Sequence, residues 1–306
     1  MRIIVEKDAP FQTVKEYLKY RLHLSSGMLS ALKRKENGIC RNGTPVTVRC
    51  LLEPPCVLEL AVEDEEKDKN PFLEPEDIPL SIVYEDDRIV VLNKPPYMPT
   101  HPSLGHRSGT LANALAYRCR DRKGTFVFRP INRLDRDTSG LVLCAYDRIS
   151  AARYTRLLQE GRFQKTYLAL VEGELHGSGC VERPIRRAEA SIILREVCAP
   201  NAEGAEYAKT EYEVLATDGK LSVLRVIPVT GRTHPIRVHR VSIVHPILGE
   251  CLYGREDPAM PRQALHAWSL SIADGEERMH FFAPVPEDIR ARVASNLPNL
   301  NLEELL

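Results

Sequence analysis

Residues 129–145 read RPINRLDRDTSGLVLCA, and this segment changes from polar to apolar within a few positions. The apolar run from Leu141 to Ala145 predicts a strand. Arg133, Asp135 and Asp137 then lie on the loop just before that strand. A loop that a rigid strand holds in place is a common position for reacting groups. The segment therefore predicts a reactive loop that leads into a core strand.

Asp135 is the candidate reactive group on this loop. A carboxylate beside Arg133 stays ionised, because a nearby positive charge favours the charged form, and an ionised carboxylate can act as a nucleophile. The alternative is an ion pair between arginine and aspartate that only ties down a turn. Structural pairs outnumber catalytic ones, so these residues on their own favour the alternative.

A second segment, QKTYLALVEG at residues 164–173, alternates between its two faces. This pattern predicts a half-buried strand with Lys165 and Tyr167 on one face. A packed tyrosine beside a solvated lysine would give the same pattern.

A third segment reads VTGRTHPIRVH at residues 229–239, and HPILGECLYG follows at residues 245–254. Gly231 and the helical spacing after it predict a helix that presents Arg232, His234 and Arg237 near its start. Helix N-termini and arginines both favour phosphate or carboxylate partners. His234 and His239 are five positions apart and share a helix face poorly, so we expect no metal site.

In this order the segments resemble the RluA-type pseudouridine synthases, whose signature is HRLDxxTSG. The resemblance covers about residues 80–290 and implies an α+β fold, the pseudouridine synthase catalytic fold with a mixed, largely antiparallel central β-sheet. It implies that the chain isomerises uridines of RNA to pseudouridine with Asp135 as its catalytic aspartate and no cofactor. Tyr167 would lie against the target uracil, with Lys165 nearby, and Arg237 would pair with Asp135, although a surface phosphate contact is a simpler role for Arg237.

The family chemistry allows three routes for the aspartate. It can attack carbon 1 of the ribose, add to carbon 6 of the ring, or assist loss of a ribose proton to give a glycal. The sequence does not choose among them. A flipped uridine is required in each case, and flipping costs least in loops and bulges.

Two further segments resemble parts of the family that shape the fold and line the RNA side: NKPPYMPTHPS at residues 93–103 and RQALHA at residues 262–267. The prolines alone could fix an extended loop without any role in binding. His266 is supporting evidence for the resemblance. The side chains expected to contact RNA in this domain are Arg133, Lys165, Arg232, His234, Lys94 and Arg262.

The sequence departs from the family pattern at three positions. Asn132 stands where histidine is usual, Pro235 where glutamine is usual, and Glu250 where aspartate is common. Asn132 can still donate and accept hydrogen bonds, whereas Pro235 loses a backbone donor and a side-chain amide. These changes bear on how RNA is positioned.

Residues 1–62 form a basic module, with ten Lys and Arg against six acids through residue 60. Apolar spacing predicts two short helices, and Asn42-Gly43 between strand-like runs predicts a hairpin. The module resembles the alpha-L RNA-binding motif, in which Lys33, Arg34, Lys35 and Arg41 would contact phosphate. A packing module with a solvated charged face is the alternative.

The acidic, proline-containing residues 63–79 predict a solvated linker. Residues 80–295 form the predicted catalytic domain, which is rich in strands and has helices near 109–119, 149–160 and 233–243. Residues 296–306 form a C-terminal tail.

The composition of the 306 residues is that of a soluble globular protein, and no apolar run approaches the roughly 18 residues of a membrane helix. Eight scattered cysteines without a CxxC pair indicate reduced thiols, and we expect a cytoplasmic monomer. The net charge of zero means that any RNA-binding surface must be local.

Ribosomal RNA of the large subunit is the expected target, and transfer RNA is the alternative. A non-catalytic RNA-binding or ribosome-assembly factor with the same fold is a second alternative. A hydrolase that uses Asp135 and Asp137 as a carboxylate pair is a third, but the two lie only two positions apart on one loop.

Overall fold

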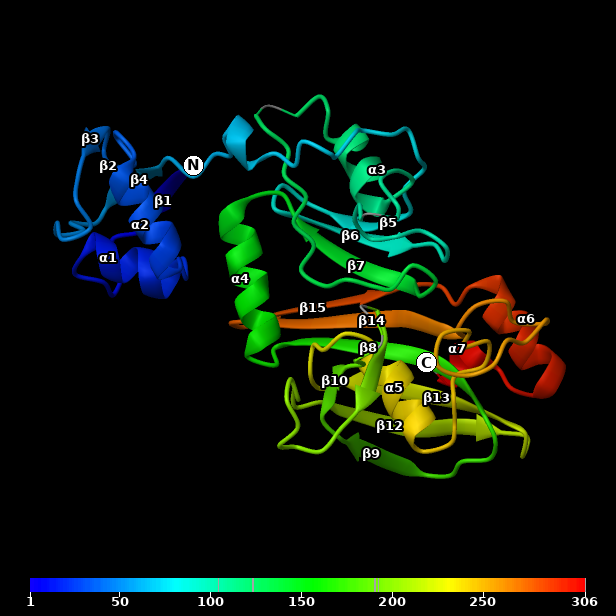
Figure 1. Ribbon diagram of the computed structural model, residues 1–306. Coiled ribbons are helices and arrows are strands. Elements are labelled where there is room, and N and C mark those ends of the chain that lie inside the picture. The colour runs from blue at the N-terminus through cyan, green and yellow to red at the C-terminus, as the bar shows by residue number, and fades with distance from the viewer. Residues whose placement is uncertain (104, 123, 190, 192, 306) are drawn as a thin grey trace.

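The computed structural model describes residues 1–306 except 104, 123, 190, 192 and 306, and it shows a small N-terminal module beside a larger body (Figure 1). The module has a four-stranded antiparallel sheet in the order β1-β4-β2-β3 and short helices that pack on it. Its elements are β1 (Arg2–Val5), α1 (Val14–Glu16), a π-helical turn (Tyr17–Arg21), α2 (Ser26–Arg34), β2 (Ile39–Arg41), β3 (Thr44–Pro45) and β4 (Cys56–Leu60).

The predicted helices and hairpin of the module are confirmed. Thr13 and Glu16 form a capping box at the start of α1, which satisfies backbone donors that the first turn leaves open. Asn42 and Gly43 both have positive φ, 51° and 78°, as a two-residue hairpin turn requires. The strands β1 and β4 were not predicted.

The body is built on one nine-stranded sheet in the order β5-β6-β7-β14-β8-β13-β12-β9, with β15 also paired to β14. Among the described strands of this sheet, only β7 and β14 run parallel, so the prediction of a mixed, largely antiparallel sheet is confirmed. The strands are β5 (Ile82–Glu85), β6 (Ile89–Lys94), β7 (Ser139–Ala145), β8 (Phe163–Glu172), β9 (Ser178–Glu182), β12 (Lys209–Thr217), β13 (Leu221–Pro228), β14 (Leu265–Asp274) and β15 (Glu277–Phe282).

The contact between β7 and β14 explains two residues of the sequence motifs. A Cβ on Gly140 would lie 2.2 Å from the carbonyl oxygen of Ala267, so only glycine fits there, and its φ is +112°. Next to it, Ser139 Oγ lies 2.9 Å from Nδ1 of the buried His266. Both strands begin at this edge, so the residues that precede them meet there.

Helices lie around this sheet, and the three predicted ones are confirmed as α3 (Leu111–Arg118), α4 (Arg148–Gln159) and α5 (Pro235–Ser242). The sequence did not predict α6 (Glu287–Asn296) or α7 (Leu302–Leu305). Leu302 is buried in the main core, and Leu297 and Leu300 pack against this core, so these residues of the predicted C-terminal tail are part of the packed body. A separate hairpin is formed by β10 (Ile185–Arg187) and β11 (Arg195–Val197).

The expectation of a solvated linker is wrong for part of residues 63–79. The Asp64 carboxylate binds both Arg129 and Arg148, and its side chain is 8% exposed. Leu73 is buried as well. The cationic partners lie 65 and 84 residues away, and such long-range pairing leaves no trace in local composition.

The module also contacts the body through α4, which lies between the two parts (Figure 1). Ile149 of α4 is buried in the apolar cluster of the module. No helix of the described residues is long and apolar enough to cross a membrane.

The buried His266 predicts a loss of stability in mild acid. Burial lowers its pKa to about 4 from the ordinary 6.5, so between these values only the unfolded chain takes up the proton. The contribution of this residue to stability is complete above pH 6.5 and is lost as the pH falls towards 4, by about 3 kcal/mol. Urea unfolding from pH 7.5 to 4 should therefore show a shallower decline for His266→Gln than for the wild type.

The exposed His280 provides the control, and His280→Gln should keep the wild-type decline. Equal pH dependence in wild type and His266→Gln would contradict the prediction.

Candidate active site

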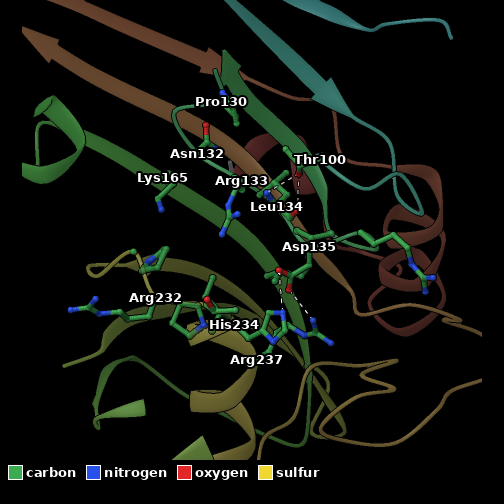
Figure 2. Close-up of a pocket in the computed structure, with 18 of the residues that line it drawn as sticks. Thr100, Pro130, Asn132, Arg133, Leu134, Asp135, Lys165, Arg232, His234 and Arg237 are labelled. Atoms are coloured by element: carbon green, nitrogen blue, oxygen red, sulfur yellow. Dashed lines mark hydrogen bonds and ion pairs between the residues drawn. The ribbon is translucent and has the colours of Figure 1, made fainter. Parts of the chain in front are cut away.

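A pocket of about 550 Å³ opens where the loop before β7, strand β8 and the start of α5 meet (Figure 2). It contains most of the side chains that the three sequence segments predicted to lie together. The polar and aromatic residues of interest among its lining include Asn132, Arg133, Asp135, Lys165, Tyr167, Arg232, His234 and Arg237.

Asp135 is held at the pocket wall by Arg237. Nη1 of Arg237 donates to Oδ2 of Asp135 at 2.8 Å, as the family resemblance implied. The Asp135 side chain is 29% exposed and that of Arg237 is 7% exposed. A molecule in the pocket can therefore contact the carboxylate, whereas the cation is nearly buried.

Arg237 has a second carboxylate partner, Glu250, whose side chain is completely buried. Two hydrogen bonds of 2.7 and 2.5 Å join the guanidinium to this carboxylate. Burial disfavours the charge of Arg237, but the bonds and charges of Glu250 and Asp135 outweigh burial and raise its pKa. In the sequence, Glu250 stands out only as a departure from the family pattern, and no local signal indicates that it belongs to the site.

The loop that carries Asp135 is fixed to the neighbouring strands. Asn132 Nδ2 donates to the carbonyl of Leu141 at 2.9 Å, and its Oδ1 accepts from the amide of Leu143 at 2.9 Å. Thr100 Oγ1 donates to the carbonyl of Leu134 at 2.8 Å. Asn132 thus joins the loop to β7 through both ends of its amide.

Lys94 and Arg262 bind backbone carbonyls of the loop that carries Asp135. Both side chains are buried, so the prediction that they bind RNA is wrong. The Lys94 ammonium is buried and lies 2.8, 2.8 and 2.9 Å from the carbonyls of Pro95, Met98 and Arg136. Burial lowers its pKa to about 7, although Asp135 and Asp137 favour the charge.

Arg262 is equally inaccessible. It pairs with Asp288 at 2.6 and 2.8 Å and donates to the carbonyl of Asp137 at 3.1 Å. Only 1% of Arg262 is exposed. Its positive charge therefore binds groups of the protein itself and is not available at the surface.

Tyr167 and Lys165 both line the pocket from β8, so the prediction of one shared face is confirmed. Burial raises the pKa of the Tyr167 phenol, and the nearby Asp135 charge adds to this effect. Burial also lowers the pKa of Lys165. The phenol ring of Tyr167 and the side chain of Lys165 thus line the same pocket as the Asp135 carboxylate.

The other predicted side chains differ in their contacts. Arg133 was expected to be the cation beside Asp135, but its Nη1 lies 3.5 Å from Nε2 of His101. Arg237 is the cation that binds the Asp135 carboxylate. Arg232 lies at the rim, where it pairs with Glu206 at 2.8 Å. His234 Nε2 lies 3.4 Å from Oδ1 of Asp135, and Figure 2 marks this contact.

Asp137 is paired with Arg136 at 2.7 and 3.0 Å and does not line the pocket. This placement weighs against the carboxylate-pair hydrolase. His239 binds Thr210 and the carbonyl of Arg183, away from Asp135. In the described part of the chain, no group of three or more His, Cys, Asp or Glu side chains is arranged to hold a metal.

Pro235 occupies the first turn of α5. The backbone N–H at this position has no partner within a helix, so its loss costs little, and the fixed φ of proline suits a helix start. The expected penalty of this departure is therefore smaller than the sequence suggested.

The cations of the N-terminal module surround a different groove. Lys33, Lys35 and Arg49 line it, whereas Arg41 pairs with Glu53 at 2.7 Å. Lys33 and Arg34 are exposed. Whether these side chains bind RNA stays a prediction.

Comparison with known proteins places these features in a family. The sequence model described as RNA pseudouridylate synthase matches residues 88–242. An uncharacterized RNA pseudouridine synthase of Bacillus subtilis, YjbO, is 35% identical over 90% of this chain and 96% of its own length. The ribosomal large subunit pseudouridine synthase D of Haemophilus influenzae is 35% identical over 76% of this chain and 74% of its own length.

Among solved structures, human RNA pseudouridylate synthase domain containing 1 superposes with a TM-score of 0.59 and 27% identity. The match covers 75% of this chain and 94% of the human chain.

The placement of Lys94 predicts a structural rather than a binding effect of its substitution. Lys94→Gln removes at least one donor to three buried carbonyls, so the free energy of unfolding should fall by about 1–3 kcal/mol. Amide hydrogen exchange at residues 133–138 should also become faster, because the Arg136 carbonyl loses its anchor. Arg133→Ala on the same loop is the control and should change neither quantity. Unchanged exchange in Lys94→Gln would show that this ammonium does not hold the loop.

Proposed function

The chain belongs to the RluA-type RNA pseudouridine synthases and is an isomerase that acts on RNA, and we propose that Asp135 is the nucleophile with which it isomerises a uridine of large-subunit ribosomal RNA. The observation that carries the proposal is the Asp135 carboxylate, which Arg237 holds at 2.8 Å in the wall of an open pocket. The hydrogen bond from this cation orients the carboxylate.

The reaction breaks the bond between the ribose and nitrogen 1 of uracil and rejoins the base through carbon 5. Nitrogen 1 gains a proton and carbon 5 loses one, so the change is redox-neutral and consumes no co-reactant. All three routes open to the aspartate require an ionised carboxylate near the ribose. Asp135 faces the pocket, where the ribose would lie, and the nearly buried Arg237 binds it from the protein side.

The base needs a flat surface once it has left its stack. Tyr167 lies in the pocket wall from β8, and we assign it this contact with uracil. Lys165 lies on the same face and would contact the RNA beside the base. Arg133 and Arg232 would contact the RNA at the pocket mouth.

Ribosomal RNA is the proposed target because several relatives of 33–37% identity are named ribosomal large subunit pseudouridine synthase D. Transfer RNA is the alternative target. A cytoplasmic location and a monomeric state stay predictions from the sequence.

We further propose that residues 1–62 are an alpha-L RNA-binding module. Its helices and hairpin match the expected pattern, and Lys33, Lys35 and Arg49 surround a groove on it. Lys35 also pairs with Glu65 at 2.7 Å, so part of this charge is neutralised. The exposed Lys33 and Arg34 are the cations through which the module would contact phosphate.

Asp135→Asn should lower turnover by about 1,000-fold or more while RNA binding persists, because the amide is not a nucleophile. Tritium release from RNA that carries uridine labelled at carbon 5 measures turnover directly. Asp137→Asn is the matched control, since that carboxylate pairs with Arg136 outside the pocket, and it should retain most activity.

The target can be mapped in cells that lack this protein, with a carbodiimide reagent that marks pseudouridine. A site that returns with the wild type but not with Asp135→Asn identifies the substrate. If no ribosomal or transfer RNA site is lost while the protein still binds ribosomal particles, the assignment of a target in these RNAs is wrong and the non-catalytic alternative is favoured.

Replacement of Lys33 and Arg34 by alanine should weaken RNA binding and reduce the slope of log affinity against log salt by about 2, one for each lost phosphate contact. The matched control replaces the exposed Lys7 and Lys15, which lie outside the groove. Equal slopes for the two double variants would argue against phosphate contacts by Lys33 and Arg34.

A further inference from the structure

His234 has an unusual backbone for its position. Its φ of 55° and ψ of 31° place it in the left-handed region, directly before Pro235. A residue before proline normally adopts an extended conformation, and left-handed residues other than glycine are uncommon. Strain of this kind persists where surrounding contacts enforce it, and it gathers at functional sites.

Two hydrogen bonds of the Tyr253 hydroxyl indicate which nitrogen of the His234 ring carries the proton. The hydroxyl of Tyr253 accepts from the backbone amide of Arg195 at 3.0 Å. The same hydroxyl lies 2.7 Å from Nδ1 of His234. The Tyr253 hydroxyl accepts from the Arg195 amide and has one proton of its own to donate. If it donates this proton to Nδ1 of His234, then the amide, the hydroxyl and the ring nitrogen all have a partner. The proton of the neutral ring therefore lies on Nε2.

That nitrogen faces the proposed nucleophile. Nε2 lies 3.4 Å from Oδ1 of Asp135, while Arg237 binds the other oxygen, Oδ2, at 2.8 Å. The separation of 3.4 Å is longer than a formed hydrogen bond, and such contacts often shorten when substrate binds. The two carboxylate oxygens thus face different nitrogen atoms, Oδ2 that of Arg237 and Oδ1 that of His234.

We propose that His234 is a positioning residue, which donates from Nε2 to Oδ1 of Asp135 and so fixes the plane of the carboxylate, with Tyr253 selecting the required tautomer. The proposal rests on the assignment of Asp135 as the nucleophile. Since Nε2 carries the proton, this ring does not act as a base towards the substrate. Burial also lowers the pKa of His234, against the charges of Asp135 and Glu250, and this favours the neutral ring.

Two substitutions at position 234 separate this role from a purely structural one. In His234→Gln the side-chain amide reaches the place of Nε2 and can still donate to Asp135. In His234→Asn the shorter amide replaces Nδ1, keeps a partner for Tyr253 and loses the contact to Asp135. Asparagine tolerates the left-handed backbone well, whereas glutamine does not, so a structural role favours His234→Asn.

We expect the opposite order in kcat. His234→Gln should stay within about 10-fold of the wild type, and His234→Asn should fall by about 100-fold, the effect of one lost donor to a reacting group. KM for the RNA should change by less than about 3-fold in both variants, because the reacting group rather than the binding surface is affected. A kcat of His234→Asn equal to or above that of His234→Gln would overturn the proposal.

Tyr253→Phe is the second measurement, and it decides the question if the variants at position 234 fail to fold. It removes only the hydroxyl that selects the tautomer, so kcat should fall by about 10-fold at constant KM. An unchanged kcat would overturn the proposed role of the tautomer. The result for Asp135→Asn keeps the two hypotheses apart: an active Asp135→Asn refutes the nucleophile, whereas an inactive one with the wrong order at position 234 refutes only the role of His234.

Discussion

The guanidinium of Arg237 is shared between Asp135 and Glu250, and the geometry of the site depends on it. Asp135 lies 102 residues before Arg237, and Glu250 lies 13 residues after it, so the ion triad joins the loop before β7 to α5 and to the segment that follows α5. A buried triad is a poor source of stability, because desolvation of the charges offsets their attraction. Its benefit is orientation: Glu250 fixes the cation, and the cation fixes the carboxylate that faces the pocket.

The parallel pairing of β7 and β14 explains why this loop is so well held. Parallel strands start at the same edge, so the residues before Ser139 and those before Leu265 meet there. Gln263 Nε2 donates to Thr138 Oγ1 at 3.1 Å, and Arg262 binds the carbonyl of Asp137. Lys94 completes the support from the neighbouring strand β6. Buried cations that bind backbone carbonyls allow an irregular loop to stay rigid without regular pairing.

Local patterns predicted those parts of the protein that local physics determines. The strand after Gly140, the shared face of Lys165 and Tyr167 and the helix after His234 follow from periodicity, and the resemblance implied the pairing of Asp135 with Arg237. The use of Lys94 and Arg262 could not be predicted, because a cation in a sequence looks the same whether it meets RNA or a buried carbonyl. The ion pairs of Asp64 could not be predicted either, because both of its arginine partners come from distant segments of the chain. Glu250 lay within a recognised segment, but only the three-dimensional contact gives it a role.

The balance of charge follows from this internal use of cations. The chain has 42 basic and 42 acidic residues, and many arginines near the site are paired with carboxylates of the protein. Arg237, Arg262, Arg136 and Arg232 all have such partners. Long-range attraction to phosphate is therefore weak around the pocket, and recognition there must rely on shape, stacking and a few direct contacts. The proposed role of the basic module fits this arrangement: the module would supply affinity for the RNA backbone, and the pocket would select and hold the uridine.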